Sequence, residues 1–403
     1  PAPVQGLRLE DAIQLALTRN ERAQIAELNV VIADAGVAKA RTAFLPVLSA
    51  SGNDTLHPRD TPLDTASGTV TLSQPLIDPT AWPLYDQARH ELAGQRAQSA
   101  DDRRQVAFDA AKAFLAVLLA DQVVQAAQRK LDTARADLAD TDAQARAQLV
   151  SSNDVTRARI GLASSERELA SDQGNLDAAY IQLGLVVKAR IAPGLVVPAA
   201  LLDAGVQPVP PADALVANSL ARRPDLAARK EIALAAHDFA REPRMRWFPT
   251  LDLEGQFTAS SQADHGHDVT GTVALKASWT IFDAGARLAD ARSRDAQAAI
   301  ADLTTDSLIR TIDAQVRTAA AALVSAQLAL VAAQGAVDAA RKSADETAIL
   351  YHQQLAKAIE LLDANEQRFA AEVNFAEAQF SVASAYLALR QAMGLDPLGG
   401  PLP

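Results

Sequence analysis

The 403-residue chain carries 38 Lys and Arg against 49 Asp and Glu, a net charge of −11, and no cysteine. These values exclude a disulfide-stapled scaffold and a Cys-ligated metal site, and the acidic balance disfavours a nucleic-acid-binding role. Aromatic residues make up only 4% of the chain while alanine is abundant, a composition typical of long, closely packed helices.

The ends and the apolar runs of the chain bear on its location. No apolar run approaches the roughly 18 residues that a membrane-spanning helix needs, so we expect no such helix. The chain begins at Pro1 with no Met, no apolar signal segment and no leading Cys. This indicates a trimmed, mature form without a visible lipid anchor. The lack of cysteine also suits an oxidising compartment.

Proline placement divides the chain. No proline occurs in residues 84–192 or 250–396. Because proline interrupts helices, these two tracts are where long helices can form. Between them, the Pro-rich segment 191–211 is predicted to be a linker with a short strand at 195–197.

An internal repeat organises the elements. Phe44-Leu45-Pro46 corresponds to Trp247-Phe248-Pro249, and Gly184-Leu185 to Gly394-Leu395, in the same order along the chain. The first repeat, residues 1–190, is predicted to contain a helix from Leu9 to about Ala43, strands at about 46–57 and 68–76, a long helix over 84–148 and a helix over 152–185. The second repeat, residues 212–396, is predicted to contain a helix from Ala212 to about Arg246, strands at about 249–261 and 269–282, and long helices over 286–354 and 358–394, before a tail at 397–403.

The predicted strands alternate with a period of two. In 249–259 and 269–281 every charged side chain falls on one face and every large apolar side chain on the other. One interpretation is a soluble antiparallel sheet with one wet face, and the other is a membrane β-barrel with its apolar face outward. The flanking helices are too rich in alanine and charge to cover an apolar sheet, so lipid is a candidate partner.

A membrane barrel would have to be shared between copies of the chain. An open four-stranded sheet in lipid would leave the backbone groups of its edges unpaired. Three copies with four strands each give twelve strands, whereas two copies give a barrel of eight with little bore.

The long helices must extend into water. The predicted helix over 84–148 would be about 98 Å long, far beyond the ~30 Å apolar core of a bilayer. Its apolar residues recur at spacings of three and four, which predicts a seam that packs on a neighbouring helix. The seam comprises Val106, Ala110, Ala113, Phe114, Val117, Ala120, Asp121 and Val124.

Several motifs, taken together and in order, resemble the outer-membrane factor (TolC-like outer-membrane efflux protein) family. They are Leu9–Asn20 with Asp213–Pro224, Phe44-Leu45-Pro46 with Trp247-Phe248-Pro249, Gln74–Asp78 with Trp279–Gly285, and Tyr351 with Ile359–Ala364. The resemblance covers nearly the whole chain. It implies a mainly α-helical protomer with membrane β-structure, in which long antiparallel helices form an α-helical barrel and four strands join a shared twelve-stranded trimeric β-barrel.

The resemblance also implies partners and a function. A homotrimer would sit in the outer membrane of a Gram-negative bacterium, extend through the periplasm, and serve as the passive exit duct of a tripartite efflux pump or type I secretion system. Its partners would be a periplasmic adaptor and an inner-membrane transporter of the RND, ABC or MFS class, and it would need no enzyme activity and no cofactor. The sequence leaves the exported substrate open.

The resemblance places a periplasmic gate at the two helical turnarounds, Gln148–Val155 and Gln354–Asp363. Tyr351, Glu360, Asp363 and Asp154 match its tyrosine and acidic positions, with an Asp154–Tyr351 hydrogen bond as a possible latch. Ala356 occupies the position of the family's arginine, and Lys357 beside it is a weaker substitute because it offers a point charge. Adaptor docking is assigned to the exposed turns, at Leu149, Val150, Leu355 and Ala356.

Charge spacing gives the gate a physical basis. Glu360 and Asp363 are three residues apart and share one helix face, so threefold symmetry would gather six carboxylates that favour cations. The plainer interpretation of such a pair is a solvated helix face.

Two other functions remain open from the residues alone: a soluble coiled-coil structural protein and a stand-alone porin-like channel. Enzyme signatures are weak. The His265-Gly266-His267 segment, the only metal-like pair of histidines, is predicted to be a loop, and no nucleophile triad or phosphate-binding loop is recognisable.

Overall fold

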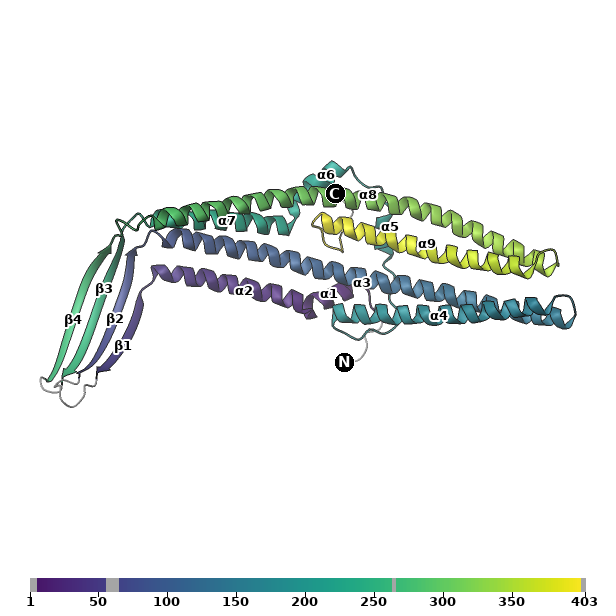
Figure 1. Cartoon of the computed structure of the whole chain (residues 1–403), viewed down its shortest axis with the longest axis horizontal. Coiled ribbons are helices and arrows are strands. Elements are labelled where there is room, and N and C mark those ends of the chain that lie inside the picture. The colour runs from purple at the N-terminus through teal and green to yellow at the C-terminus, as the bar shows by residue number, and fades with distance from the viewer. Residues whose placement is uncertain (1–5, 56–64, 263–265, 400–403) are drawn as a thin grey trace. The chain divides into compact units, whose positions relative to one another are not determined.

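The computed structural model describes residues 6–55, 65–262 and 266–399 (Figure 1). The chain forms two compact units: unit 1 comprises Pro1–Ala26, Ala100–Arg223 and Arg310–Pro403, and unit 2 comprises Glu27–Ser99 and Pro224–Ile309. His265 and the ends of the predicted first strand (56–57) and tail (400–403) lie outside the described residues.

Unit 2 contains a four-stranded antiparallel sheet in the order β1-β2-β3-β4 (Figure 1). Its strands are β1 (Val47–Thr55), β2 (Thr65–Ile77), β3 (Thr250–Gln262) and β4 (Gly266–Ser278). The last strand ends at Ser278, four residues earlier than predicted, because residues 279–285 turn into the next helix. Chain segments about 200 residues apart in sequence therefore meet at the β2–β3 pair.

The register of the sheet aligns side chains of one kind across all four strands. Leu48 pairs with Leu72, Leu72 with Gly255, and Gly255 with Val273, which makes one apolar row. The neighbouring row is polar and consists of Ser49, Thr71, Gln256 and Thr272. The alternation predicted from the sequence is therefore confirmed as a two-faced sheet.

Two helices predicted as continuous are each broken once. The first is α1 (Leu9–Arg19) followed by α2 (Glu21–Arg41), because Asn20 is extended and its side-chain oxygen accepts from the Arg22 N–H at 2.9 Å, capping α2. The second is α6 (Ala212–Arg222) followed by α7 (Pro224–Met245). Proline is well suited to the first position of a helix but disfavours a helical residue before it, so the break falls at Arg223.

The linker also differs from its prediction. Residues 195–197 form no strand, although the Val196 N–H donates to the Leu7 carbonyl at 3.1 Å. The linker instead contains a short helix, α5 (Ala199–Gly205), which packs against α9 within unit 1.

Two long helical hairpins carry the rest of the chain. One joins α3 (Ala81–Arg146) to α4 (Ser152–Val187), and the other joins α8 (Ala286–His352) to α9 (Ala358–Ala392). The core of unit 1 includes Phe108, Phe114, Leu183, Leu215, Ile312 and Leu387, all fully buried. Of the predicted seam, Val106, Ala110, Phe114 and Val117 are buried, which confirms that this stripe of α3 packs against other helices.

One helix in the described part of the chain, α8, is long and apolar enough to cross a membrane by length and composition alone. The sequence predicted no such helix, because polar residues interrupt every apolar run of α8. The uncharged part of α8 is residues 318–337. Within it, Gln327 donates to the carbonyl oxygens of Gly205 and Gln207 at 2.7 and 2.9 Å, so this stretch packs on the linker.

Candidate gate and membrane surface

The two helical turnarounds share one backbone geometry. Gln148 and Gln354 both adopt positive φ angles, of 60° and 63°. The residue after each one then donates back to the preceding helix, Leu149 to the Gln144 carbonyl and Leu355 to the Leu350 carbonyl. The backbone thus reverses in the same way at the ends of α3 and α8, at positions that the repeat relates.

The predicted latch between Asp154 and Tyr351 is absent from the protomer, although both side chains line one groove in unit 1. Asp154 accepts from the N–H and the hydroxyl of Ser151, at 3.1 and 2.8 Å, and thereby caps the start of α4. Tyr351 is buried, and its hydroxyl lies 3.2 Å from that of Thr141 on α3. The Asp154 carboxylate is therefore engaged at the start of α4, and the Tyr351 hydroxyl is paired with a residue of α3 and not with Asp154.

Glu360 and Asp363 are exposed and bond only along their own chain segment. The Lys357 N–H donates to Glu360 at 3.0 Å, which caps α9, and the Gln367 amide donates to Asp363 at 2.8 Å. Within the described residues neither carboxylate forms a salt bridge, and the Lys357 ammonium forms none with them. Both acids are free to face a lumen or solvent.

Three of the four predicted docking residues, Leu149, Val150 and Ala356, line the same groove, and Leu355 lies beside Ala356 in the turn. Leu149 and Leu355 are 57% and 72% exposed, which is unusual for leucine. Val150 and Ala356 are partly exposed and line the groove together with Asp154 and Tyr351.

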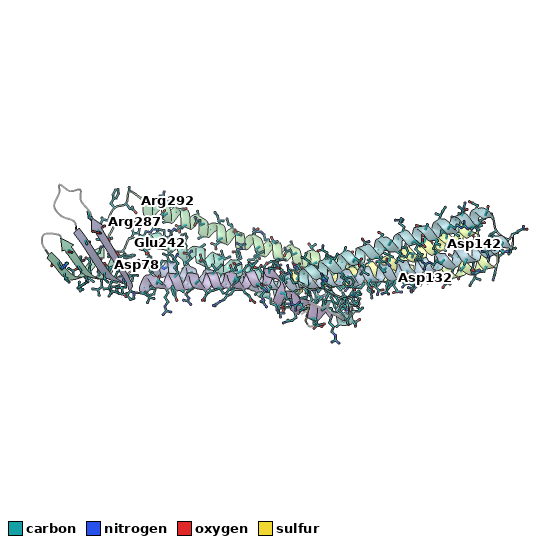
Figure 2. All side chains as sticks on the ribbon, turned by 90° about the horizontal axis from the view of Figure 1, so that it is seen from below. Asp78, Asp132, Asp142, Glu242, Arg287 and Arg292 are labelled. Carbon is teal, nitrogen blue, oxygen red and sulfur yellow. The ribbon has the colours of Figure 1, made fainter. Side chains whose placement is uncertain are left out.

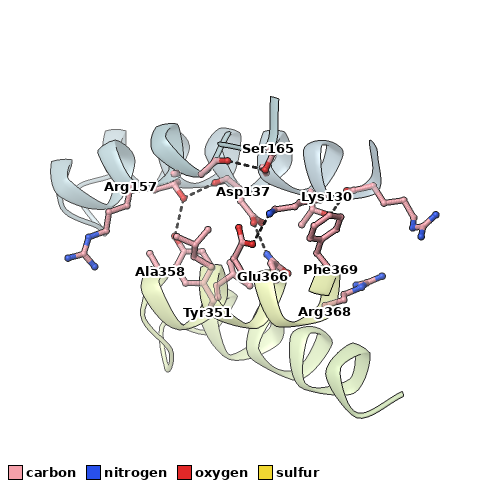
Figure 3. A pocket seen from close by; sticks show the side chains of 18 of the residues that line it. Lys130, Asp137, Arg157, Ser165, Tyr351, Ala358, Glu366, Arg368 and Phe369 are labelled. Atoms are coloured by element: carbon pink, nitrogen blue, oxygen red, sulfur yellow. Dashed lines mark hydrogen bonds and ion pairs between the residues drawn. The ribbon is translucent and has the colours of Figure 1, made fainter. Parts of the chain in front are cut away.

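A cavity lined by both charged and apolar side chains, which the sequence did not predict, lies between the two hairpins of unit 1 (Figure 3). Lys130 on α3 donates to Glu168 on α4 at 2.6 Å and to Glu366 on α9 at 2.7 Å, and its ammonium lies 4.5 Å from the centre of the Phe369 ring. Burial alone would lower the pKa of Lys130, but the two glutamates outweigh it and raise that pKa. Its partners lie 38 and 236 residues away, so no local pattern could reveal them.

Asp137 on α3 lies in the same cavity. The Asn365 amide on α9 donates to its carboxylate at 2.9 Å. Burial, and then the negative charge of Asp140, raise the pKa of the Asp137 carboxyl to about 6.

In unit 2, charged and aromatic side chains fix the junction between the sheet and the helices (Figure 2 labels Glu242 and Arg287). The Arg287 guanidinium donates to Asp283 at 2.7 Å and to the Arg246 carbonyl at 2.9 Å, and it stacks 4.0 Å from the Trp247 ring. Backbone and side-chain donors of Arg287 lower the pKa of Asp283. The turn from β4 into α8 is therefore rigidly held.

Large apolar side chains are exposed across the sheet and at this junction. Leu48 and Val273, at the two ends of the apolar row, are 70% and 81% exposed. Exposed aromatic residues gather where the strands meet the helices: Trp82, Trp247, Phe248, Trp279 and Phe282. The Trp279 indole N–H is paired with the Trp247 carbonyl at 3.1 Å, leaving its ring available to an apolar or interfacial partner.

Long helical hairpins attached to a two-faced sheet with an exposed apolar side are the features of an outer-membrane channel protomer. The chain belongs to the outer membrane efflux protein family, whose model matches residues 12–187 and 215–395. This membership favours a channel over the soluble coiled-coil alternative, and the family consists of transport conduits. No curated protein is similar to the chain at a significant level.

Solved structures show the same fold at low sequence identity. CusC, described in terms of transmembrane channel formation, is 19% identical with a TM-score of 0.85, covering 96% of this chain and 92% of its own. The Campylobacter jejuni CmeC outer membrane channel is 16% identical with a TM-score of 0.81, covering 96% and 85%. The open state of the Neisseria gonorrhoeae MtrE outer membrane channel is 21% identical with a TM-score of 0.82, covering 97% and 91%.

Proposed function

We propose that three copies of the chain form a passive exit duct that spans the outer membrane and extends through the periplasm. A periplasmic adaptor docks at the helical turnarounds, and an inner-membrane transporter drives the substrate, as in a tripartite efflux or type I secretion system. The chain itself supplies the conduit and a gate at its periplasmic tip.

The observation that carries this proposal is the four-stranded sheet with an apolar row exposed on one face. Its edge strands, β1 and β4, each pair with one strand and have no neighbour on their outer side in the described part of the chain. Lipid would suit the apolar row but not the two open edges, whose N–H and C=O groups need partners. Strands from sister copies would satisfy both edges at once and close the sheet into a barrel.

Strand length and aromatic placement support a membrane position. β2, β3 and β4 each contain 13 residues, about 43 Å of strand at ~3.3 Å per residue, which is enough to cross a bilayer core when tilted. The aromatic residues at the junction with the helices match the girdle that such barrels place at the membrane interface. They would mark the periplasmic edge of the lipid.

Helix length supports a periplasmic shaft. α3 and α8 contain 66 and 67 residues, about 100 Å each at ~1.5 Å per residue. Their exposed charges exclude lipid as the solvent, so they would form the wall of a water-filled tunnel.

The gate is assigned to the turnarounds. Under threefold symmetry, Glu360 and Asp363 from each copy would form rings of carboxylates at a constriction, with Tyr351, Asp154 and Lys357 nearby. Such rings favour cations and can bind a blocking cation. The exposed Leu149 and Leu355, with Val150 and Ala356, would contact the adaptor, whose docking would open the tip by untwisting the inner helices.

Single-channel currents in planar bilayers test the duct and its gate together. The double variant Glu360→Gln, Asp363→Asn is expected to lose cation preference and block by multivalent cations. Asp338→Asn, at an exposed site on α8 away from the turnarounds, is the matched control and should retain both. Absence of channels in the wild-type protein would contradict the duct. Unchanged selectivity and block in the double variant would remove these residues from the constriction, and high conductance without an adaptor would indicate an ungated porin.

A further inference from the structure

We propose that Asp137 is the proton-sensitive part of a clasp that holds the α3/α4 hairpin against the α8/α9 hairpin, and that protonation of its carboxyl tightens the clasp. The clasp comprises Arg129–Glu372, Lys130–Glu366, Asp137–Asn365 and Thr141–Tyr351, all in unit 1. Its effect on conduction rests on the proposed function, whereas the clasp itself is a property of the folded chain.

Helical spacing places the members of the clasp in one line. On α3, Lys130 and Asp137 are seven residues apart and Thr141 lies four further on, so all three share one face. On α9, Asn365 and Glu372 are likewise seven residues apart. Figure 3 shows side chains from the two hairpins, Lys130 and Asp137 opposite Glu366 among them, directed into the cavity between them.

The two links farthest from the turnarounds hold permanent charges. The Glu372 carboxylate, only 7% exposed, receives donors from Arg129, Arg341 and Arg368. Burial would raise the pKa of Glu372, but the guanidinium groups of Arg129 and Arg341 outweigh it and lower that pKa. The raised pKa of Lys130 and the lowered pKa of Glu372 both favour the charged form of these two groups.

The Asp137 link differs in kind. Among the described residues, Asp137 forms no salt bridge, and one amide donor from Asn365 is the hydrogen bond that reaches its carboxylate from the opposite hairpin. Because Asp137 is half-buried and bonds no cation directly, its carboxylate is costly in the charged form; burial, and then the charge of Asp140, raise its pKa to about 6. It therefore changes charge where the other links do not.

Charged and titratable groups face Asp137 from each helix around the cavity. Asp140 on its own helix raises the pKa of Asp137, and His352 on α8 lowers it. The remaining groups that line the cavity are Arg129 and Lys130 on α3, Asp154 and Arg157 on α4, Tyr351 on α8, and Glu366, Arg368 and Glu372 on α9. Their positive and negative charges are mixed, so the lack of a direct partner at Asp137 decides its behaviour.

The sign of the effect follows from linkage. When the hairpins part, water reaches Asp137 and its pKa returns toward the ordinary value of 3.8. The clasped state then binds the proton more tightly than the parted state, so the clasp strengthens as the pH falls through about 6 and weakens as it rises. Between about pH 7.5 and pH 5 the ratio of clasped to parted hairpins should rise roughly tenfold.

The lack of native cysteine makes a direct distance measurement possible. Spin labels at Ala139→Cys on α3 and Ala370→Cys on α9, both exposed sites, report the separation of the hairpins by pulsed electron paramagnetic resonance. Labelled chain is diluted into excess unlabelled full-length chain, so that each assembly carries one labelled copy. The label pair is measured in four backgrounds: the otherwise native sequence, Asp137→Asn, Asn365→Ala and Asp132→Asn.

The native background is expected to move toward the shorter distance as the pH falls below about 6. Asp137→Asn should remain at the shorter distance throughout. Asn365→Ala removes a donor that lowers the pKa of Asp137 and should shift the midpoint upward. Asp132→Asn, at an exposed α3 site, should respond as the native background does. A native distance independent of pH, or a full response in Asp137→Asn, would overturn the proposal.

Bilayer currents on the unlabelled protein separate this result from the proposed function. A pH-dependent distance without any channel would leave the clasp in place and contradict the duct. Channels without a pH-dependent distance would support the duct and contradict the clasp.

Discussion

The two units fasten their helices with polar clusters of opposite character. In unit 2, Glu242 is 5% exposed, accepts both donors of the Arg246 fork at 2.8 and 2.9 Å, and accepts from Arg294 at 2.6 Å. Near the tip of unit 1, Asp137 has a single amide partner across the hairpins and a pKa of about 6. The carboxylate of the first cluster is paired with two guanidinium groups, whereas that of the second has no cation partner and a raised pKa. In the proposed duct, the first cluster would hold the helices at the membrane end and the second would act near the gate.

The largest expected effect tests the fixed cluster. Glu242→Ala would leave Arg246 and Arg294 without their shared carboxylate and should lower the free energy of unfolding by about 3 kcal/mol. Asp295→Ala removes a pair between exposed side chains, Arg244–Asp295, and should cost less than about 1 kcal/mol. Thermal unfolding of the purified protein measures both, and equal costs would show that burial does not set the strength of the cluster.

The next effect tests which face of the sheet meets lipid. Val273→Lys places a charge on the apolar row and should cost about 2–4 kcal/mol of membrane insertion if that row faces the centre of the bilayer. Thr272→Lys, one residue away on the polar row, should insert normally. Fractionation of membranes and assay of assembled oligomer distinguish the two, and the reverse order of effects would invert the assigned faces.

A smaller effect is expected at the tip. Tyr351→Phe keeps the buried ring but loses the hydrogen bond to Thr141, which should cost about 1 kcal/mol. Hydrogen exchange at the end of α8 should accelerate roughly fivefold as a result. Tyr180→Phe removes a hydroxyl that accepts from the Gly194 N–H and should leave exchange at the tip unchanged. Unaltered exchange in Tyr351→Phe would exclude this bond from holding the hairpins.

The smallest expected effect tests how His352 influences the pKa of Asp137. His352 lowers the pKa of Asp137 through its positive charge, so His352→Gln should move the midpoint of the hairpin response upward by a few tenths of a pH unit. The spin-label titration measures this shift. A downward shift would mean that His352 does not act on Asp137 through its charge.

The sequence predicted the features whose causes are local. The alternation in 249–259 and 269–281 marks the strands because a period of two separates the faces of any strand. Local signals also existed for the breaks that the prediction missed: Asn20 is a preferred capping residue, and Pro224 marks the start of a helix. The apolar periodicity continues across both positions, so each pair of helices was predicted as one helix despite these signals.

Side-chain contacts between residues far apart in the sequence could not be predicted from the sequence. Asp137 and Asn365 lie 228 residues apart, and nothing near either one reveals the other. The Asp154–Tyr351 bond was predicted from the family resemblance. In the structure, the Asp154 carboxylate instead accepts from Ser151, three residues away in the sequence. The roles of Glu360, Asp363 and Lys357 stay predictions, since they depend on contacts between copies of the chain.

Electron imaging of the purified protein in lipid nanodiscs tests the central claim most directly. A barrel shared by three copies requires a threefold particle in which the lipid disc surrounds the strands and a helical shaft of about 100 Å projects from one side. Single copies, or particles whose strands lie outside the disc, would contradict it.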